Sequence, residues 1–303
     1  MLVILAVVQD RGTGQVSATN MQVQVGEPCE ENLPTLYRES FHPDLYIDQF
    51  FGSLESEPEI QWMLDQAHRI FGGVGEVGPL GMGEEQGVPR TLVEIGTGPI
   101  PFNTISASRW AGTIIWTDYL QRNRDYLWQL LGSSQLWERF SSFFNHVGKL
   151  EGRSIEYISQ RLTSRVQNIS PVDATQLSPL GAEHCQADVV FSHLCLEYVV
   201  SERKLFRKII KNIIRIIKPG GFLVLQSAMG ADSYYMGDVK FPSTNTSKAF
   251  LELCLTEAGL KLMEYKEFSS PTAGEEYGLT PGGEKTTDHA GVYSLVAQKG
   301  VKL

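Results

Sequence analysis

Apolar residues recur along the chain with the two spacings that distinguish amphipathic helices from buried strands. Residues 53 to 72 carry apolar side chains three and four positions apart, which predicts a helix that starts near Ser53 or Ser56 and stops at Gly72. The same spacing and its end signals predict helices at 104–110, 120–131, 135–161, 203–218 and 247–259. Short unbroken apolar runs predict strands at 92–95, 113–118, 189–191, 222–226 and 293–299.

Strands and helices alternate through most of this pattern, which is the order of a parallel sheet with crossover helices. We therefore expect an α/β fold with a single domain over residues 36–303. Residues 1–35 show no sustained period after an opening apolar run and are expected to be a poorly ordered extension. That opening run, MLVILAVV, is eight residues long and too short to span a bilayer, and a weak signal-peptide core is the alternative for it.

The acidic balance of the chain limits its partners. The formal net charge is −9 and the isoelectric point is near 5.2, so sequence-independent binding to nucleic acid is not expected, whereas a cationic small molecule would be tolerated. The cysteines, which are Cys29, Cys185, Cys195 and Cys254, are scattered without CxxC or Cys/His spacing. We expect free thiols, no bound metal, and a monomeric cytoplasmic protein without a membrane partner.

A glycine turn follows the strand predicted at 92–95. In LVEIGTGPIPFNT, Gly96 and Gly98 permit backbone conformations that side chains obstruct, and the next segment can begin a helix whose free N–H groups face the same point. A dinucleotide fingerprint would have its third glycine at position 101, where this chain has Pro101. The turn by itself is consistent with a ligand site or with a purely structural turn.

Acidic residues follow other strands of the predicted sheet. Asp118 lies twenty residues beyond Gly98, at a strand end where a carboxylate can accept hydrogen bonds from both hydroxyls of a ribose. The turn and this acid together predict a nucleoside site, although Asp118 alone could cap the next helix. Asp173 is placed to accept from an adenine amino group, and Glu197 lies nearer the open end of the crevice, but each could instead be a solvated loop acid.

Short motifs from Tyr37 to Lys299 resemble class I S-adenosylmethionine-dependent methyltransferases, and more narrowly the nicotinamide, phenylethanolamine and indolethylamine N-methyltransferases. The motifs are SFHPDLYIDQFF, LVEIGTGP, IIWTDYLQRN, DATQLSPLG, LCLE, KPGGFLVL, SYYMGDVKF and GVYSLVAQK. The resemblance implies a Rossmann-like fold with a mostly parallel seven-stranded sheet flanked by helices, and an N-terminal helical lid at residues 36–72. It also implies S-adenosylmethionine as cofactor and a small-molecule amine as acceptor.

The resemblance assigns cofactor roles residue by residue. Gly96 to Gly98 would contact the methionyl part, Asp118 the ribose and Asp173 the adenine, and Tyr46 would lie between cofactor and acceptor. The family usually has tyrosines at positions 51 and 102 and a small hydroxyl residue at 193, so hydroxyl hydrogen bonds to the cofactor are lost here and His193 is a partial substitute. The full set of matched positions is Tyr37, Tyr46, Phe51, Gly96, Thr97, Gly98, Phe102, Asp118, Tyr119, Asn123, Asp173, Ala174 and His193.

The acceptor side is matched in the same way. Ser227 stands where nicotinamide-specific members have an Asp, which argues against nicotinamide as the acceptor. Glu197, Asp232 and Asp288 match or lie near acids of the phenylethanolamine-type enzymes, and three anions at one crevice suit a protonated amine. The matched acceptor positions are Tyr46, Leu194, Glu197, Ser227, Asp232, Tyr235 and Asp288.

The implied reaction is in-line transfer of a methyl group, which is catalysed mainly by alignment of the reactants. The predicted catalytic residues are Tyr46, Glu197 and Asp232: a carboxylate removes the proton of the amine, directly or through water, and Tyr46 excludes solvent. Two alternatives stay open. One is a protein of this fold that has lost catalysis and acts as a binding or regulatory module, and the other is a nicotinamide-dinucleotide oxidoreductase, which Pro101 disfavours.

Overall fold

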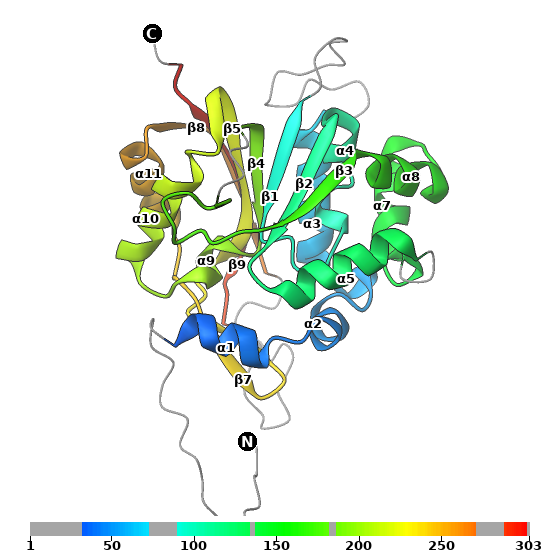
Figure 1. The fold of residues 1–303 in the computed structure, drawn as a ribbon, viewed down its shortest axis with the longest axis horizontal. Helices are drawn as coiled ribbons and strands as arrows, with labels where there is room; N and C mark the ends of the chain where they lie inside the picture. The colour runs from blue at the N-terminus through cyan, green and yellow to red at the C-terminus, as the bar shows by residue number, and fades with distance from the viewer. Residues whose placement is uncertain (1–31, 73–89, 134–136, 182–185, 271–287, 302–303) are drawn as a thin grey trace, which may run out of the picture.

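A seven-stranded sheet with the order β3-β2-β1-β4-β5-β9-β8 forms the centre of the molecule (Figure 1). The computed structural model describes residues 32–72, 90–133, 137–181, 186–270 and 288–301. The first 31 residues, Cys29, Cys185 and nearly all of the Gly-rich segment before β1 lie outside the described residues. Within them, no helix is long and apolar enough to cross a membrane.

The predicted strands are all found in the sheet, and two more are added to them. Neighbouring strands from β3 to β5 are parallel, whereas β9 runs antiparallel to both β5 and β8. The sheet therefore confirms the expected mostly parallel α/β fold. Its members are β1 (Thr91–Ile95), β2 (Thr113–Asp118), β3 (Val166–Pro171), β4 (Ala187–His193), β5 (Ile217–Met229), β8 (Leu260–Ser269) and β9 (Gly291–Lys299), of which β3 and β8 had not been predicted.

Helices cover both faces of this sheet. One face carries α3 (Pro58–Ile70), α4 (Ala107–Trp110), α5 (Gln121–Gly132), α7 (Ser141–Glu151) and α8 (Ile155–Arg165). The other face carries α10 (Arg203–Ile213) and α11 (Lys248–Glu257). The apolar stripe predicted at residues 53–72 is the buried face of α3, and a 3-10 helix, η1 (Leu54–Ser56), precedes it.

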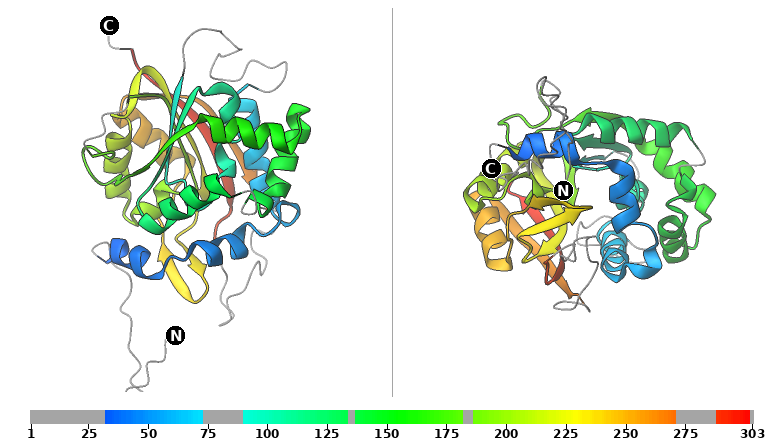
Figure 2. Two further views of the ribbon diagram at one scale, coloured as in Figure 1. Left: turned by 45° about the vertical axis from the view of Figure 1, so that its right-hand side comes forward. Right: turned by 90° about the horizontal axis from the view of Figure 1, so that it is seen from below.

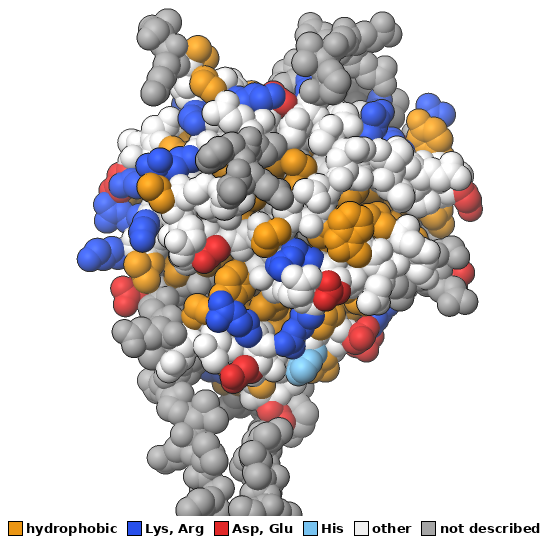
Figure 3. Space-filling model, viewed as in Figure 1, with side chains coloured by type: hydrophobic (Ala, Val, Ile, Leu, Met, Phe, Trp, Pro, Cys, Tyr) orange, Lys and Arg blue, Asp and Glu red, His pale blue; other side chains and the backbone are white. Residues whose placement is uncertain are grey.

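Helix α10 is shorter than its apolar pattern predicts. The helix ends at Ile213, and Ile217 belongs to β5, where it pairs with Ala187 of β4. Pro219, Gly220 and Gly221 therefore do not end the helix but interrupt the start of β5, where the register to β4 shifts. The outward face of α10 is cationic, and Lys and Arg side chains gather over this helix in the space-filling view (Figure 3).

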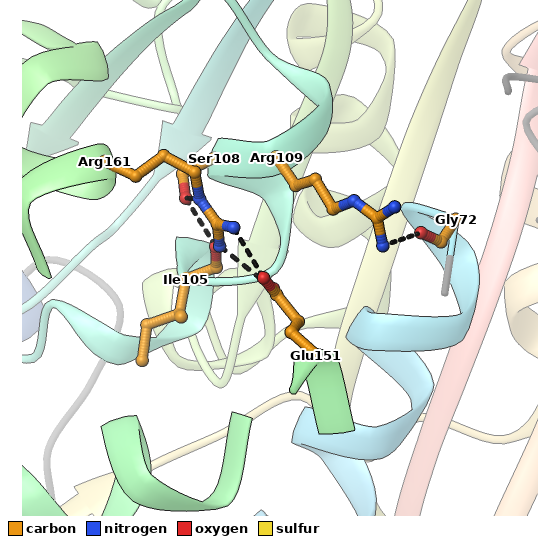
Figure 4. Close-up of polar contacts among 6 residues, drawn as sticks. All are labelled: Gly72, Ile105, Ser108, Arg109, Glu151 and Arg161. Carbon is orange, nitrogen blue, oxygen red and sulfur yellow. Dashed lines mark hydrogen bonds and ion pairs between the residues drawn. The ribbon is translucent and has the colours of Figure 1, made fainter. Parts of the chain in front are cut away.

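A buried arginine holds the segment that follows the glycine turn. Arg161 of α8 forms an ion pair with Glu151 of α7, and it also donates to Ser108 Oγ at 2.8 Å and to the carbonyl of Ile105 at 3.0 Å (Figure 4). Two predicted helices are divided in this region. The segment at 104–110 forms η2 (Phe102–Thr104) and α4, and the helix predicted at 135–161 breaks at Gly152, whose φ is +63°.

Two helices and a hairpin lie across the carboxyl ends of the parallel strands (Figure 2). They are α1 (Leu33–Ser40), α2 (Pro43–Phe50), and the strands β6 (Ser233–Met236) and β7 (Val239–Pro242). We call these elements the lid. The first helix starts at Leu33, which is 1% exposed, so residues on the N-terminal side of the boundary expected at residue 35 belong to this helix. Helix α3 was expected in the lid but packs against the sheet, where Gln226 Nε2 donates to the carbonyl of Met63 at 2.9 Å.

Candidate active site

The glycine turn is forced by the close approach of two strand ends. Gly96 and Gly98 have φ values of +70° and +64°, a region that glycine adopts without strain. A Cβ on Gly96 would lie 2.0 Å from Sγ of Cys195, which follows β4. The backbone N–H of Thr97 donates to the carbonyl of Thr117 at 2.8 Å, and Thr97 Oγ1 accepts from the N–H of Thr117 at 3.2 Å. The turn is thus fixed to β2 on one side and to β4 on the other.

Asp118 organises the neighbouring backbone at the end of β2. Its Oδ2 accepts from the N–H of Gly98 at 2.8 Å, and its Oδ1 accepts from the N–H of Leu120 at 2.8 Å and from Nδ2 of Asn123 at 3.1 Å. Burial raises the pKa of Asp118, and these hydrogen bonds oppose the shift. Asp118 therefore supports the start of α5, as its structural alternative predicts, and also lines the cavity described below.

Asp173 holds the loop after β3 in a compact turn. Its Oδ1 accepts from the N–H of Thr175 at 3.0 Å and from Thr175 Oγ1 at 2.6 Å. From α10, Asn212 Nδ2 donates to the carbonyls of Ala174 and Thr175, both at 3.1 Å. These contacts keep Asp173 and Ala174 at the same sheet edge as Asp118.

Aromatic side chains of the lid face this edge. The ring of Tyr46 lies 4.9 Å from Phe41 and 5.3 Å from Phe51 between ring centroids, and Tyr234 of β6 stacks on Phe241 at 5.0 Å. The lid is held together by Gln49 of α2, whose Nε2 donates to the carbonyl of Tyr235 at 2.7 Å and whose Oε1 accepts from the N–H of Gly237 at 2.9 Å. From α5, Arg122 donates to the carbonyl of Phe41 at 2.6 Å.

A cavity of about 690 Å³ lies between the lid and the strand ends. Its wall is mostly apolar and aromatic, with a few polar groups at the strand ends, which is typical of small-molecule sites. The structure brings most of the predicted site residues together around this one space. They are Tyr37, Tyr46, Phe51, Gly96, Thr97, Gly98, Asp118, Tyr119, Asn123, Asp173, Ala174, His193 and Leu194.

Three predicted site residues are buried behind the cavity wall. Phe102 is 0% exposed and stacks on Phe143 at 4.1 Å between ring centroids, so it belongs to the core and not to the cavity lining. Glu197 and Ser227 are 2% and 3% exposed, and neither lines the cavity. Glu197 follows the wall residues Leu194 and Cys195 and precedes the wall residue Tyr198 in the chain.

Three other predicted residues face outward. Asp232 is exposed, and its Oδ1 accepts from Asn245 Nδ2 at 3.1 Å, while Asp288 accepts from the N–H of Asp232 at 3.0 Å. The ring of Tyr235 lies beside Lys240, whose Nζ is 5.8 Å from its centroid. Successive residues of a strand point to opposite sides, so Tyr234, which had not been predicted, lines the cavity in place of Tyr235.

Burial dominates the protonation of groups around the cavity. Burial lowers the pKa of His193 to about 3, so its imidazole is neutral, and Nδ1 has no hydrogen-bond partner among the described residues. Burial raises the pKa of Glu197 to about 8, opposed only by hydrogen bonds from backbone amides, and its Oε1 has no partner in the described part of the chain. Burial and nearby carboxylates raise the pKa of Cys195 well above its usual value, so this thiol is no nucleophile.

Several polar wall residues were missed in the sequence, among them three at the start of α3 and before β9. Glu57 and Glu59 stand at the start of α3, and His289 precedes β9. His289 Nε2 lies 2.6 Å from Glu59 Oε2, across 230 residues of chain. The acidic start of α3 was visible in the sequence, but it reads there only as a favourable helix N-terminus.

Known N-methyltransferases are similar to this chain in sequence. Human nicotinamide N-methyltransferase is 28% identical over 270 residues, which cover 87% of this chain and 94% of the relative. Mouse indolethylamine N-methyltransferase is 25% identical over 273 residues, covering 87% of this chain and 95% of the relative. Human phenylethanolamine N-methyltransferase is 29% identical over 187 residues, or 60% of this chain and 66% of that protein.

Solved structures show the same fold at lower identity. Magnesium protoporphyrin IX methyltransferase from Synechocystis, solved with bound S-adenosylmethionine, matches with a TM-score of 0.54 at 10% identity over 91% of this chain and 99% of its own. The cyclase SpnF matches with a TM-score of 0.53 at 16% identity over 91% and 97% of the two chains. At such identities the likeness concerns the fold alone.

The family comparison is more specific than the fold. The model of the NNMT/PNMT/TEMT family matches residues 31–300, which include every described strand, the lid and the cavity wall. This match confirms the resemblance that the motifs indicate. The chain belongs to the NNMT/PNMT/TEMT family and is an N-methyltransferase.

Proposed function

We propose that this N-methyltransferase transfers a methyl group from S-adenosylmethionine to the nitrogen of a small-molecule amine bound in the cavity beneath the lid. One observation carries the proposal: the glycine turn, Asp118 and the loop at Asp173 meet at one end of a 690 Å³ cavity that the lid aromatics close. The cofactor is S-adenosylmethionine. When bound, it supplies an electrophilic methyl group on a sulfonium sulfur.

The residues at this end of the cavity fit that cofactor. Asp118 accepts three hydrogen bonds from backbone and amide donors, and a carboxylate has about four acceptor positions, so one position remains for a ribose hydroxyl. Gly96 and Gly98 leave the backbone open to close approach. His193 has a neutral ring whose Nδ1 lacks a hydrogen-bond partner among the described residues, which suits it to a polar group of the methionyl part.

The lid residues would position the acceptor. Tyr46 and Tyr234 present aromatic faces to the cavity, and such faces attract positively charged groups by on the order of 0.5 to 2 kcal/mol. A closed lid excludes water from the reacting nitrogen. Its lone pair is then not hydrogen-bonded to solvent and keeps the orientation needed for attack. Positioning by these walls supplies the main rate enhancement in this proposal.

Glu197 is the carboxylate that we assign to the amine proton. It is buried beside the cavity, its Oε1 lacks a partner among the described residues, and its pKa of about 8 is close to the working pH, as a general base requires. A protonated amine in the cavity favours the charged carboxylate, which can then take the proton, directly or through water, before the nitrogen attacks. Asp232 is exposed and bonded to Asn245, so we give it no catalytic role.

A screen with radiolabelled methyl donor over aromatic amines, indolethylamines, pyridines and thioethers tests the activity. We expect labelled product from at least one primary amine and calorimetric binding of S-adenosylmethionine. Glu197→Gln should lower kcat by about 100-fold, the lower end of what a general base contributes, while Asp232→Asn stays within about twofold of the parent. Absence of any methylated amine, with intact cofactor binding, would refute the amine assignment.

We also propose that the enzyme acts as a cytoplasmic monomer without nucleic-acid or membrane partners. The acidic net charge and the small, enclosed cavity support this. Light scattering after size exclusion tests the oligomeric state, and a mass near twice 33.8 kDa would overturn it.

A further inference from the structure

One end of the cavity wall carries charged groups that the proposed methyl transfer does not use. Glu57 stands at the N-cap position of α3 without a side-chain capping hydrogen bond, Glu59 lies in the first turn, and His289 precedes β9. Glu59 Oε2 and His289 Nε2 are in hydrogen-bond contact, and the two side chains are 16% and 15% exposed. We call these three residues the α3–β9 cluster.

The sheet order places the α3–β9 cluster away from the cofactor residues. Asp173 follows β3 at one side of the sheet, Asp118 follows β2, and Gly96 follows β1, whereas His289 adjoins β9, five strand positions from β3. Neighbouring strands are about 4.8 Å apart, so the edge from β3 to β9 spans roughly 24 Å. A cofactor over β1 to β3 therefore leaves the β5 and β9 side of the cavity, where Ala228 and His289 line the wall, to the acceptor.

The polar groups on this side have unused hydrogen-bonding capacity. Glu59 Oε1 is buried and has no hydrogen-bond partner among the described residues. An unpaired buried acceptor is unfavourable, so a ligand that donates a hydrogen bond to it is favoured.

The charge of the α3–β9 cluster selects the kind of donor. When both are ionised, Glu57 and Glu59 carry two negative charges and His289 supplies at most one positive charge, so in this form the cluster has a net negative charge. Burial and the charge of Glu59 raise the pKa of Glu57 to about 7, and a cation beside it would favour the ionised form. No described group of three or more His, Cys, Asp or Glu side chains is arranged to hold a metal ion, so an organic cation fits better.

We infer that Glu57 and the Glu59–His289 pair bind a second protonated nitrogen of the acceptor, so that the preferred substrate is a diamine whose far amine reaches the α3–β9 cluster. This inference rests on the proposed function, because it assigns the methylated nitrogen to the region near Glu197. The preferred substrate then carries two positive charges and is long enough to reach from Glu197 to the α3–β9 cluster, and Glu57 is a specificity-determining residue.

A matched pair of substrates tests the inference. 2-Phenylethylamine and its 4-aminomethyl derivative differ by one ammonium group at the far end of the ring. We expect kcat/KM to be at least tenfold higher for the diamine, and Glu57→Gln to reduce that ratio about tenfold. Glu55→Gln is the matched control, because Glu55 is exposed on η1 and outside the cavity lining, and it should leave the ratio unchanged. A parent enzyme without preference for the diamine, or an unchanged ratio in Glu57→Gln, overturns the inference.

Binding measurements separate this inference from the proposed function. Calorimetry with S-adenosylhomocysteine present should show the diamine binding about tenfold more tightly than the monoamine, with the difference reduced in Glu57→Gln and in Glu59→Gln. Methylation of the monoamine without tighter diamine binding would overturn only the diamine assignment. Tighter diamine binding that depends on Glu57, without methylation of either amine, would support the subsite and refute the proposed reaction. Glu59→Gln also serves if Glu57→Gln does not fold.

Discussion

The backbone N–H of Gly98 donates to Oδ2 of Asp118 at 2.8 Å, so the glycine turn and the acid at the end of the next strand form one unit. We predict that Asp118→Asn weakens binding of S-adenosylhomocysteine at least tenfold and lowers the free energy of unfolding by about 1 to 3 kcal/mol, because an amide N–H₂ would face backbone donors. Calorimetry and urea denaturation measure the two effects.

The control for this variant is Asp125→Asn. Asp125 lies on the exposed side of α5, where its Oδ1 accepts from Gln121 Nε2 at 2.7 Å. Asp125→Asn should change the free energy of S-adenosylhomocysteine binding and the free energy of unfolding by no more than about 0.5 kcal/mol each. Equal effects of the two substitutions would show that Asp118 does not organise the site.

Gly96 has both a left-handed backbone and a close neighbour, whereas Gly152 has only the former. Alanine at either position costs roughly 1 to 2 kcal/mol for its φ, which is +70° at Gly96 and +63° at Gly152. At Gly96 the new Cβ would also lie 2.0 Å from Cys195 Sγ, while at Gly152 it would meet nothing within 4 Å. We predict that Gly96→Ala destabilises by at least about 2 kcal/mol more than Gly152→Ala in urea denaturation. Matching losses in the two variants would show that the strand ends relax apart.

Glu94 links stability to pH. This residue of β1 is 0% exposed, Asn103 Nδ2 donates to its Oε1 at 3.0 Å, and burial raises its pKa from 4.5 to about 8. Between pH 4.5 and 8 the folded protein holds a proton that the unfolded chain has lost, so Glu94 makes stability fall as pH rises, by on the order of 1 kcal/mol per unit.

Replacement of Glu94 by Gln removes this dependence while it keeps an acceptor for Asn103. We predict that Glu94→Gln has about the same unfolding free energy as the parent near pH 5 and is more stable by on the order of 3 kcal/mol at pH 8. Glu197 has a similarly raised pKa, so part of the slope persists in the variant. Urea denaturation from pH 5 to pH 8 is the measurement, and parallel curves for the two proteins would contradict it.

Gln49 joins α2 to the β6–β7 hairpin through two hydrogen bonds of 2.7 and 2.9 Å. We predict that Gln49→Ala lowers amide protection about tenfold in residues 33–50 and 233–242, because each lost bond contributes about 1 kcal/mol to keeping the lid closed. Hydrogen exchange followed by mass spectrometry measures this. Gln61→Ala, at an exposed position of α3, is the control and should leave the lid unchanged.

An element could be predicted from the sequence where its apolar pattern is compatible with only one kind of secondary structure. Strands β1, β2 and β4 are buried on both faces and therefore show as plain apolar runs. In edge strand β8, whose sequence is LKLMEYKEFS, apolar residues alternate with charged ones, and this strand was not predicted. The end of α10 was wrong because an isoleucine at position 217 satisfies a helical stripe and a buried strand equally well.

The site could be predicted on the cofactor side, where motif and strand order agree, but less well on the acceptor side. The choice between Tyr234 and Tyr235 depends on which face of β6 meets the cavity, and a strand of four residues with two tyrosines side by side does not indicate it. The α3–β9 cluster depends on a contact between Glu59 and His289 across 230 residues, which no local pattern reveals.

Strand β9 lies between β5 and β8, although both of these precede it in the chain. During translation, the two flanking strands emerge from the ribosome with their facing edges open, and they can join only after residue 299 has followed. Open strand edges invite pairing with other chains. We expect nascent chains of this enzyme to need chaperone protection until β9 inserts, and the wall at His289 to be among the last parts to form.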